Sequence, residues 1–300
     1  MAFISRIFAF VGFLLCIFIS PVQTAAASPE PEIVIVPVRV AGSDWNVHVQ
    51  LFKPEGAGPF PLLIFSHGRA GKSEDRAALK YPVLRGHVDY WMRQGFAVLA
   101  PFRPGYGETG GTDIETGGIR ISQNGECTGN PTYDQAAERA ADTIVATVLW
   151  AQKQPWVKAD TIVLAGQSVG GMATVAAGAR NLRGVIGYIN FSGGDGGDPE
   201  RTAGKSCFPE ALTSLYASYG RTTKIPNLWL YAENDLFWGA DMPPRWHQAF
   251  VRSGGKGQFV ETDPVPNADG HKLLANGGRL WADHVEPFMK SLLNPTKAIN

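Results

Sequence analysis

Ser168 is a candidate nucleophile, because it lies within the sequence Gly-Gln-Ser-Val-Gly-Gly over residues 166–171. An apolar run over residues 161–165 precedes it and small residues follow, a pattern that predicts a strand, a sharp turn and a helix. Glycines two positions before and after the serine let the backbone approach closely where a Cβ would not fit. This pattern is typical of a strained turn that presents a nucleophilic serine.

A serine hydroxyl needs a base to take its proton, and that base needs a carboxylate to hold its tautomer. In this arrangement the histidine follows the serine along the chain, which leaves His247, His271 and His284 of the six histidines. His247 and His284 fall in predicted helices. His271 lies in an irregular segment directly after Gly270, so we predict it as the base, in a flexible position. The alternative is an ordinary surface histidine.

The carboxylate is expected in a loop at the same edge of the sheet as the serine. Asp235 follows the apolar residues 228–231 at the end of a predicted strand, and we predict it as the acid. Asp195 follows the preceding predicted strand and is the competing candidate. Glu233 and Asp241 are expected to be solvated or structural.

An oxyanion formed during attack needs two backbone N–H donors. We predict the amide of Val169, next to the serine, and the amide of Arg69, in the loop over residues 66–69 after an early strand. His67 is expected to brace this loop by hydrogen bonds rather than act as a base. The Arg69 guanidinium could bind an anionic substrate, although a solvated side chain is the expectation.

Apolar periodicity places these residues on an alternation of strands and helices. An antiparallel pair is expected over 33–40 and 47–53. Strands are then expected over 61–66, 96–102, 161–165, 184–191, 227–232 and 257–262, and helices over 88–94, 133–154, 168–180, 208–219, 243–253 and 276–292. This is the pattern of an α/β fold with a mostly parallel, doubly wound sheet. The long irregular stretches 105–131 and 192–206 are expected to follow strands, and we predict that their loops shape a pocket.

Composition indicates a globular protein whose one domain spans residues 28–300. The 300 residues are 44% apolar and carry a formal net charge of zero. No cluster of basic residues is present, which argues against nucleic acid as a partner. No group of residues has the spacing of zinc or iron ligands, so neither a metal nor a cofactor is expected.

Residues 1–27 have the order of a secretory signal peptide. Arg6 precedes thirteen apolar residues over 7–19, and small residues lead to expected cleavage after Ala27. An uncleaved anchor is the weaker alternative, because thirteen residues are too few to span a bilayer comfortably. The mature protein is therefore expected to be secreted or periplasmic, without a stable membrane anchor. Its two remaining cysteines, Cys127 and Cys207, are predicted to form a disulfide, with two unpaired buried cysteines as the alternative.

Together, residues 61–69, 166–171, 233–235 and 270–271 resemble the α/β-hydrolase superfamily over nearly all of the mature chain. Within it, the chain is similar to dienelactone hydrolase-like and prolyl-oligopeptidase-like esterases, which share an Arg/Gly/Tyr-containing loop like that at 102–107. The resemblance implies an α/β-hydrolase fold, to which this sequence adds an antiparallel N-terminal pair. No large cap insertion or amino-terminal propeller is expected, which argues against a true oligopeptidase. Dienelactone hydrolases usually carry a cysteine nucleophile, so a serine favours ordinary ester or amide acyl transfer over lactone cleavage.

The expected function is that of a secreted serine hydrolase that cleaves carboxylic esters through an acyl-enzyme, with a triad of Ser168, His271 and Asp235. One alternative is a serine peptidase or amidase with the same triad. Another is an exported binding protein of the same fold without catalysis. In either case a small-molecule ester or a peptide is the expected ligand, and a hydrophobic pocket could be lined by Trp238, Trp246, Tyr106 and Phe237.

Overall fold

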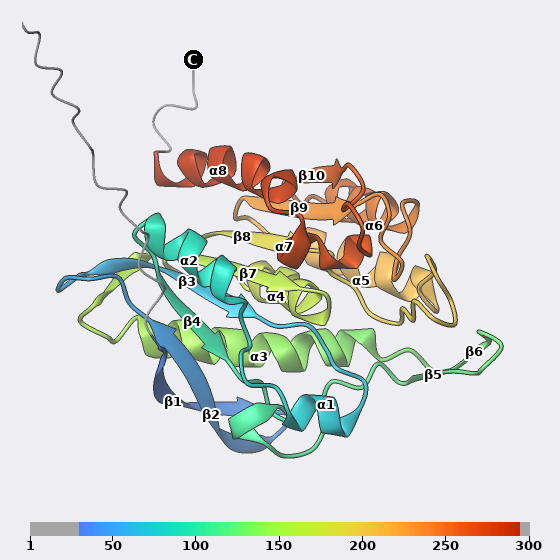
Figure 1. Cartoon of the computed structure of the whole chain (residues 1–300), viewed down its shortest axis with the longest axis horizontal. Helices are drawn as coiled ribbons and strands as arrows, with labels where there is room; N and C mark the ends of the chain where they lie inside the picture. Colours follow the sequence, from blue (N-terminus) through green and yellow to red (C-terminus); the bar gives the residue numbers. More distant parts are fainter. Residues whose placement is uncertain (1–29, 295–300) are drawn as a thin grey trace, which may run out of the picture.

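The computed structural model describes residues 30–294, so the predicted signal peptide over residues 1–27 lies outside the described residues. A sheet of eight strands forms its centre, in the order β1-β2-β4-β3-β7-β8-β9-β10 (Figure 1). These strands are β1 (Glu32–Val40), β2 (Ser43–Phe52), β3 (Phe60–Ser66), β4 (Ala97–Pro101), β7 (Val157–Gln167), β8 (Val185–Phe191), β9 (Asn227–Ala232) and β10 (Gly257–Thr262). The helices are α1 (Ser73–Ala77), α2 (Arg85–Arg93), α3 (Tyr133–Ala151), α4 (Val169–Ala179), α5 (Pro209–Gly220), α6 (Met242–Arg252), α7 (Leu273–Asn276) and α8 (Arg279–Leu293).

The antiparallel opening pair predicted from the sequence is present. β1 pairs antiparallel with β2, and β2 pairs antiparallel with β4, whereas the other pairs of this sheet are parallel. The turn between β1 and β2 uses Ala41 and Gly42, both with positive φ, which suits the twist of a tight hairpin. β1 alternates buried and exposed residues, but β4 and β9 are buried throughout. Continuous burial is expected of strands that helices cover on both faces.

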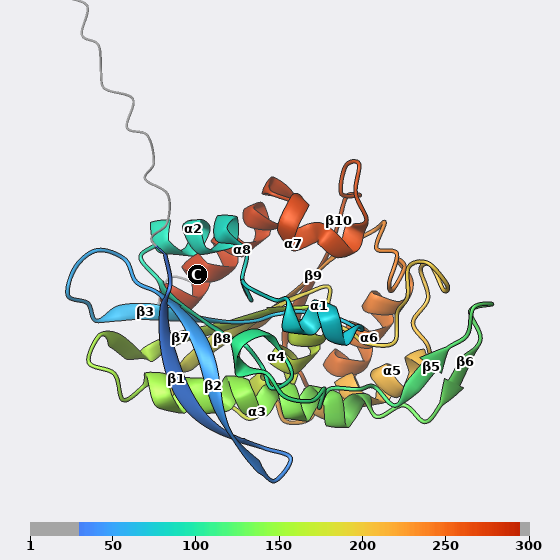
Figure 2. The ribbon, with the colours of Figure 1, turned by 60° about the horizontal axis from the view of Figure 1, so that its bottom comes forward.

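Helices cover both faces of the sheet and create two apolar layers. α3, α4, α5 and α6 pack on one face, and α2, α7 and α8 pack on the other (Figure 2). α4 is buried over its whole length because its glycines and alanines let it lie tightly between α3 and the sheet. Within residues 30–294, no helix is both long and apolar enough to cross a membrane.

Two parts of the fold differ from the sequence expectation. The stretch 105–131 contains a hairpin of β5 (Ile119–Ile121) and β6 (Cys127–Gly129), which projects from the body of the molecule (Figure 1). The helix expected over 276–292 is present as α8 but begins three residues later, at Arg279, and a separate short helix, α7, ends at Asn276. The break falls at Gly278, whose φ of 45° does not continue a helix.

Candidate active site

Ser168 occupies the turn between β7 and α4, as the sequence pattern predicted. Its backbone has φ 58° and ψ −127°, a strained conformation for a residue with a side chain. A Cβ on Gly166 would collide with the Gly170 carbonyl oxygen, and a Cβ on Gly170 would collide with the Ser66 carbonyl oxygen. The Ser168 amide donates to the Phe191 carbonyl at 3.0 Å. The glycines are thus required by close backbone approach on both sides of the serine.

His271 and Asp235 are brought together at the end of the sheet. The Nδ1 atom of His271 lies 3.1 Å from Oδ2 of Asp235, which is only 2% exposed. The other carboxylate oxygen, Oδ1, accepts the amides of Phe237 at 2.8 Å and Trp238 at 3.2 Å. Because an ionised carboxylate can only accept hydrogen bonds, it favours the tautomer of His271 in which Nδ1 carries the proton. Nε2 is then the basic nitrogen of the imidazole.

His271 is buried and held by several contacts, whereas the sequence suggested an irregular loop position. It lies in a short 3₁₀ helix (Gly270–Lys272) and is buried. The Asp269 carboxylate accepts its amide at 2.9 Å, and the Phe237 ring stacks on its imidazole with centroids 4.0 Å apart. Gly270 is needed for space, because a Cβ there would lie 2.5 Å from the Asp235 amide nitrogen. The glycine therefore lets the segments of acid and base touch.

Asp195, the competing acid, lies in the loop after β8 and is not the carboxylate that His271 contacts. Its Oδ1 accepts the Gly196 amide at 2.7 Å, while its buried Oδ2 has no hydrogen-bond partner among the described residues. Burial raises the pKa of Asp195 to about 6, and the hydrogen bond from the Gly196 amide and the nearby Arg69 guanidinium only partly oppose this. The two carboxylates thus have different surroundings.

The loop over residues 66–69 crosses directly above the serine. A Cβ on Gly68 would lie 3.3 Å from the Ser168 Cβ. Neither the Arg69 amide nor the Val169 amide has a backbone acceptor within the described part of the chain. The Val169 amide is the first of α4, where N–H groups lack helical partners. Both amides expected to bind an oxyanion therefore lack a backbone partner, and Arg69 directly follows Gly68, which lies close to Ser168.

His67 braces this loop, as expected. Its Nδ1 contacts the Gly68 carbonyl oxygen at 2.7 Å, and its Nε2 accepts the Arg103 amide at 3.3 Å. Burial, together with the nearby Arg103 guanidinium, holds the pKa of His67 well below its usual value. The ring is therefore neutral, with its proton on Nδ1. Both ring nitrogens have hydrogen-bond partners, so the residue has a structural role.

Two arginine–carboxylate pairs around the loop were not anticipated from the sequence. Arg103 is fully buried and donates to Glu115, to the Ser66 hydroxyl at 3.0 Å and to the His67 carbonyl oxygen. Arg69, expected to be solvated, forms an ion pair with Asp113 at 2.5 Å. Both acidic residues lie on the stretch 110–118, so this stretch holds the loop above the serine.

A cavity of about 350 Å³ opens beside His271. It is lined by Phe65, His67, Gly68, Tyr81, Pro82, Leu84, Gln167, Phe237, Asp269, His271, Lys272, Leu274 and Ala275. Of the four aromatic residues expected to line a pocket, Phe237 does so, whereas Trp238, Trp246 and Tyr106 are buried in the interior. The loops 110–118 and 192–198, also expected to shape a pocket, do not line this cavity.

Residues 30–294 contain no group of three or more His, Cys, Asp or Glu side chains suited to hold a metal ion.

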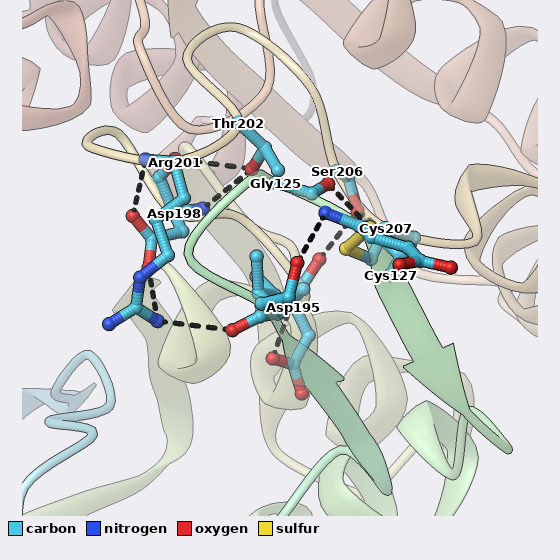
Figure 3. The surroundings of a disulfide bond; sticks show 12 residues. Gly125, Cys127, Asp195, Asp198, Arg201, Thr202, Ser206 and Cys207 are labelled. Carbon is cyan, nitrogen blue, oxygen red and sulfur yellow. Dashed lines mark hydrogen bonds and ion pairs between the residues drawn. A yellow bond between two sulfur atoms is a disulfide. The ribbon is translucent and has the colours of Figure 1, made fainter.

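Cys127 and Cys207 form a disulfide, the pairing expected from the sequence (Figure 3). Their Cα atoms are 5.7 Å apart, so the bond joins β6 to the segment that precedes α5. The Cys207 amide donates to the Gly196 carbonyl at 2.8 Å, and the Ser206 hydroxyl donates to the Asp195 carbonyl at 2.7 Å. The projecting hairpin is thereby connected to the loop that carries Asp195.

No known protein family matches the sequence, and no curated protein matches it either. Solved structures do match. The chain is similar to an esterase from Pyrococcus furiosus, Pf2001, with 15% identity and a TM-score of 0.59 over 87% of this chain and 91% of that chain. A protein assigned as a dienelactone hydrolase from Klebsiella pneumoniae has 15% identity and a TM-score of 0.53, over 86% of this chain and 98% of that chain.

An acylaminoacyl peptidase from Pyrococcus horikoshii is 13% identical with a TM-score of 0.58, and the match covers 91% of this chain but 43% of the peptidase. These similarities, with the strand order described above, define the class: the chain has the α/β-hydrolase fold. The resemblance predicted from the sequence is confirmed at this level. Among residues 30–294 there is no large cap domain, again as expected.

Proposed function

We propose that this chain is a serine hydrolase that cleaves carboxylic esters through an acyl-enzyme. The observation that carries the proposal is the contact of His271 with the buried Asp235, at the same end of the sheet as the strained Ser168. Structures of similar fold include a protein named as an esterase and another named as an acylaminoacyl peptidase, which supports acyl transfer as the reaction class.

In the proposed reaction, the Ser168 hydroxyl attacks the ester carbonyl while His271 Nε2 accepts its proton. Asp235 stabilises the resulting imidazolium through Nδ1. The amides of Arg69 and Val169 donate to the oxyanion of the tetrahedral intermediate. His271 then returns the proton to the leaving alcohol, which departs and leaves an acyl group on Ser168. Water, activated by His271, attacks this acyl group and releases the carboxylic acid.

We also propose that the enzyme is exported, with residues 1–27 as its signal peptide and residues 28–300 as its single mature domain. The disulfide between Cys127 and Cys207 supports export, since structural disulfides persist in oxidising compartments. The mature protein would act outside the cytoplasm, in the periplasm or the medium.

A fluorophosphonate probe and a short p-nitrophenyl ester test the proposed function. The parent protein should be labelled stoichiometrically at Ser168 and should hydrolyse the ester. Ser168→Ala should lose both properties while keeping its circular dichroism, and Ser73→Ala, at an exposed serine, should keep both. Equal hydrolysis by Ser168→Ala and the parent would refute the proposal. Peptide p-nitroanilides in the same assay should be cleaved more slowly than the ester.

A further inference from the structure

The cavity beside His271 is bounded by two parts of the chain that are far apart in sequence. Tyr81, Pro82 and Leu84 come from the segment that leads into α2. Leu274 and Ala275 come from α7. Gly68, which lies against Ser168, also lines it, so a group in the cavity is next to the proposed reacting atoms.

Its walls are mainly apolar. Phe65 and Leu274 are buried at 3% and 7% exposure, whereas Tyr81 and Leu84 keep half of their surface exposed. Phe237 covers one face of the His271 imidazole. Single exposed apolar side chains are common on protein surfaces. Two of them beside a cavity next to a candidate nucleophile indicate a binding surface.

The polar side chains in the wall already have partners or face solvent. His67 is held by the Gly68 carbonyl and the Arg103 amide. Asp269 accepts the amides of His271 and Leu236, each at 2.9 Å. Gln167 donates to the His271 carbonyl at 3.2 Å, and Lys272 is exposed. The lining of this cavity therefore offers no unpaired buried charge to an ionic substituent.

We propose that this cavity binds an apolar substituent of the substrate ester, an alkyl chain of about six to eight carbons or an aromatic ring. The inference rests on the proposed function. At about 350 Å³ the cavity falls within the size range of small-molecule pockets, so a substituent of this size can enter it. Because each buried methylene favours binding, kcat/KM should rise roughly three- to fourfold per added carbon until the cavity is full.

Two ester series test this inference: p-nitrophenyl esters with acyl chains of increasing length, and acetates of alcohols of increasing length. In at least one of the two series, kcat/KM should rise with each added methylene. Leu84→Asp should abolish that rise, and Ile35→Asp should keep it. Leu84 and Ile35 are matched at 46% and 45% exposure, but Ile35 lies on β1, away from the cavity lining. Leu84 is the N-cap of α2, where aspartate is favourable, so this variant is expected to fold.

A binding measurement separates this inference from the proposed function. In Ser168→Ala, octan-2-one should bind at least tenfold more tightly than butan-2-one, and adding Leu84→Asp should remove the difference. One outcome is that octan-2-one binds more tightly than butan-2-one while the parent neither hydrolyses an ester nor reacts with the fluorophosphonate. In that outcome the proposed function is wrong and the apolar site stands. Equal binding of the two ketones, or a flat response in both ester series, would overturn the inference.

Discussion

Arg103 and Glu115 form an ion pair in which both side chains are completely buried. The pair is bidentate, with Nη2 of Arg103 at 2.9 Å from Oε2 of Glu115. The same guanidinium donates to the Ser66 hydroxyl and the His67 carbonyl, at the start of the loop above Ser168. Buried ion pairs add little net stability compared with apolar residues of similar size. We infer that this pair positions the loop whose Arg69 amide is proposed to bind the oxyanion.

Removing one member of this pair should destabilise the fold. Glu115→Gln leaves the buried Arg103 guanidinium without its counter-charge and should lower the free energy of unfolding by about 3–5 kcal/mol. Urea denaturation measures this change. Asp44→Asn is the control, because Asp44 pairs with Arg39 at the exposed surface and should cost less than about 1 kcal/mol. Equal losses in the two variants would contradict the prediction.

A double variant separates positioning from stability. Arg103→Met with Glu115→Leu replaces the pair by apolar groups and should restore most of the stability lost in Glu115→Gln. It should still have a reduced kcat, because the hydrogen bonds to Ser66 and His67 are gone. Recovery of both stability and kcat would show that the pair is structural only.

The strands β7 and β9, which lead to Ser168 and Asp235, could be predicted because each contains a continuous apolar run, whereas the 3₁₀ helix that carries His271 is too short to show a period. β5 and β6 have three residues each, too few for a period to appear. The partners of Arg69 and Arg103 could not be predicted, since Asp113 and Glu115 reach them only through the path of the 110–118 loop. Cavity residues such as Leu84 escaped notice because an exposed apolar residue resembles ordinary surface until the fold places it beside His271.

Asp235→Asn should impair the proposed catalysis without disturbing the fold. The amide can still accept the Phe237 and Trp238 N–H groups but favours the wrong tautomer of His271, so kcat should fall about 10³- to 10⁴-fold. Asp195→Asn is the control, and its kcat should fall less than about tenfold because Asp195 does not contact His271. Steady-state hydrolysis of a p-nitrophenyl ester measures both. The reverse order of effects would assign the acid role to Asp195.

Asp195 should also make stability depend on pH. Its pKa is raised by burial to about 6 from an ordinary 3.8, with Glu115 and Asp113 adding to the rise, and the Gly196 hydrogen bond and Arg69 opposing it. Between pH 3.8 and about pH 6, Asp195 is protonated in the folded chain but ionised in the unfolded chain. The folded state is therefore relatively more stable at low pH, and this advantage is lost as the pH rises through about 6. The shift corresponds to about 3 kcal/mol.

Asp195→Asn removes this titration. Relative to the parent, the variant should therefore gain up to about 3 kcal/mol in unfolding free energy between pH 4 and pH 7. Urea denaturation at several pH values gives the difference directly. A difference between variant and parent that stays constant across this range would contradict the prediction.

The disulfide should contribute to stability because it closes a long loop. Cys127 and Cys207 are separated by 80 residues, so reduction should lower the free energy of unfolding by about 2–5 kcal/mol. Thermal or urea denaturation with and without a thiol reductant measures the loss, and Cys127→Ser with Cys207→Ser should lose a similar amount and no longer respond to reductant. Two free thiols in denatured, unreduced protein would show that the bond does not form.

The close approach at Gly270 leads to a prediction about both stability and activity. In Gly270→Ala, the new Cβ would lie 2.5 Å from the Asp235 amide nitrogen and 2.7 Å from the Asn234 carbonyl carbon. Because both contacts are with backbone, the segments of acid and base must move apart, at a cost of about 1–3 kcal/mol in stability. The contact between His271 and Asp235 should lengthen, and kcat should fall about 10²-fold since a displacement of about 1 Å has that effect.

Gly71→Ala is the matched control, because a Cβ at Gly71 meets nothing within 4 Å and its backbone does not have positive φ. This variant should keep both the stability and the kcat of the parent. Urea denaturation and ester hydrolysis are measured for the two variants side by side. A Gly270→Ala protein indistinguishable from Gly71→Ala would mean that the His271 segment is as mobile as its loop sequence suggested, and that close packing against Asp235 does not set the geometry of the proposed triad.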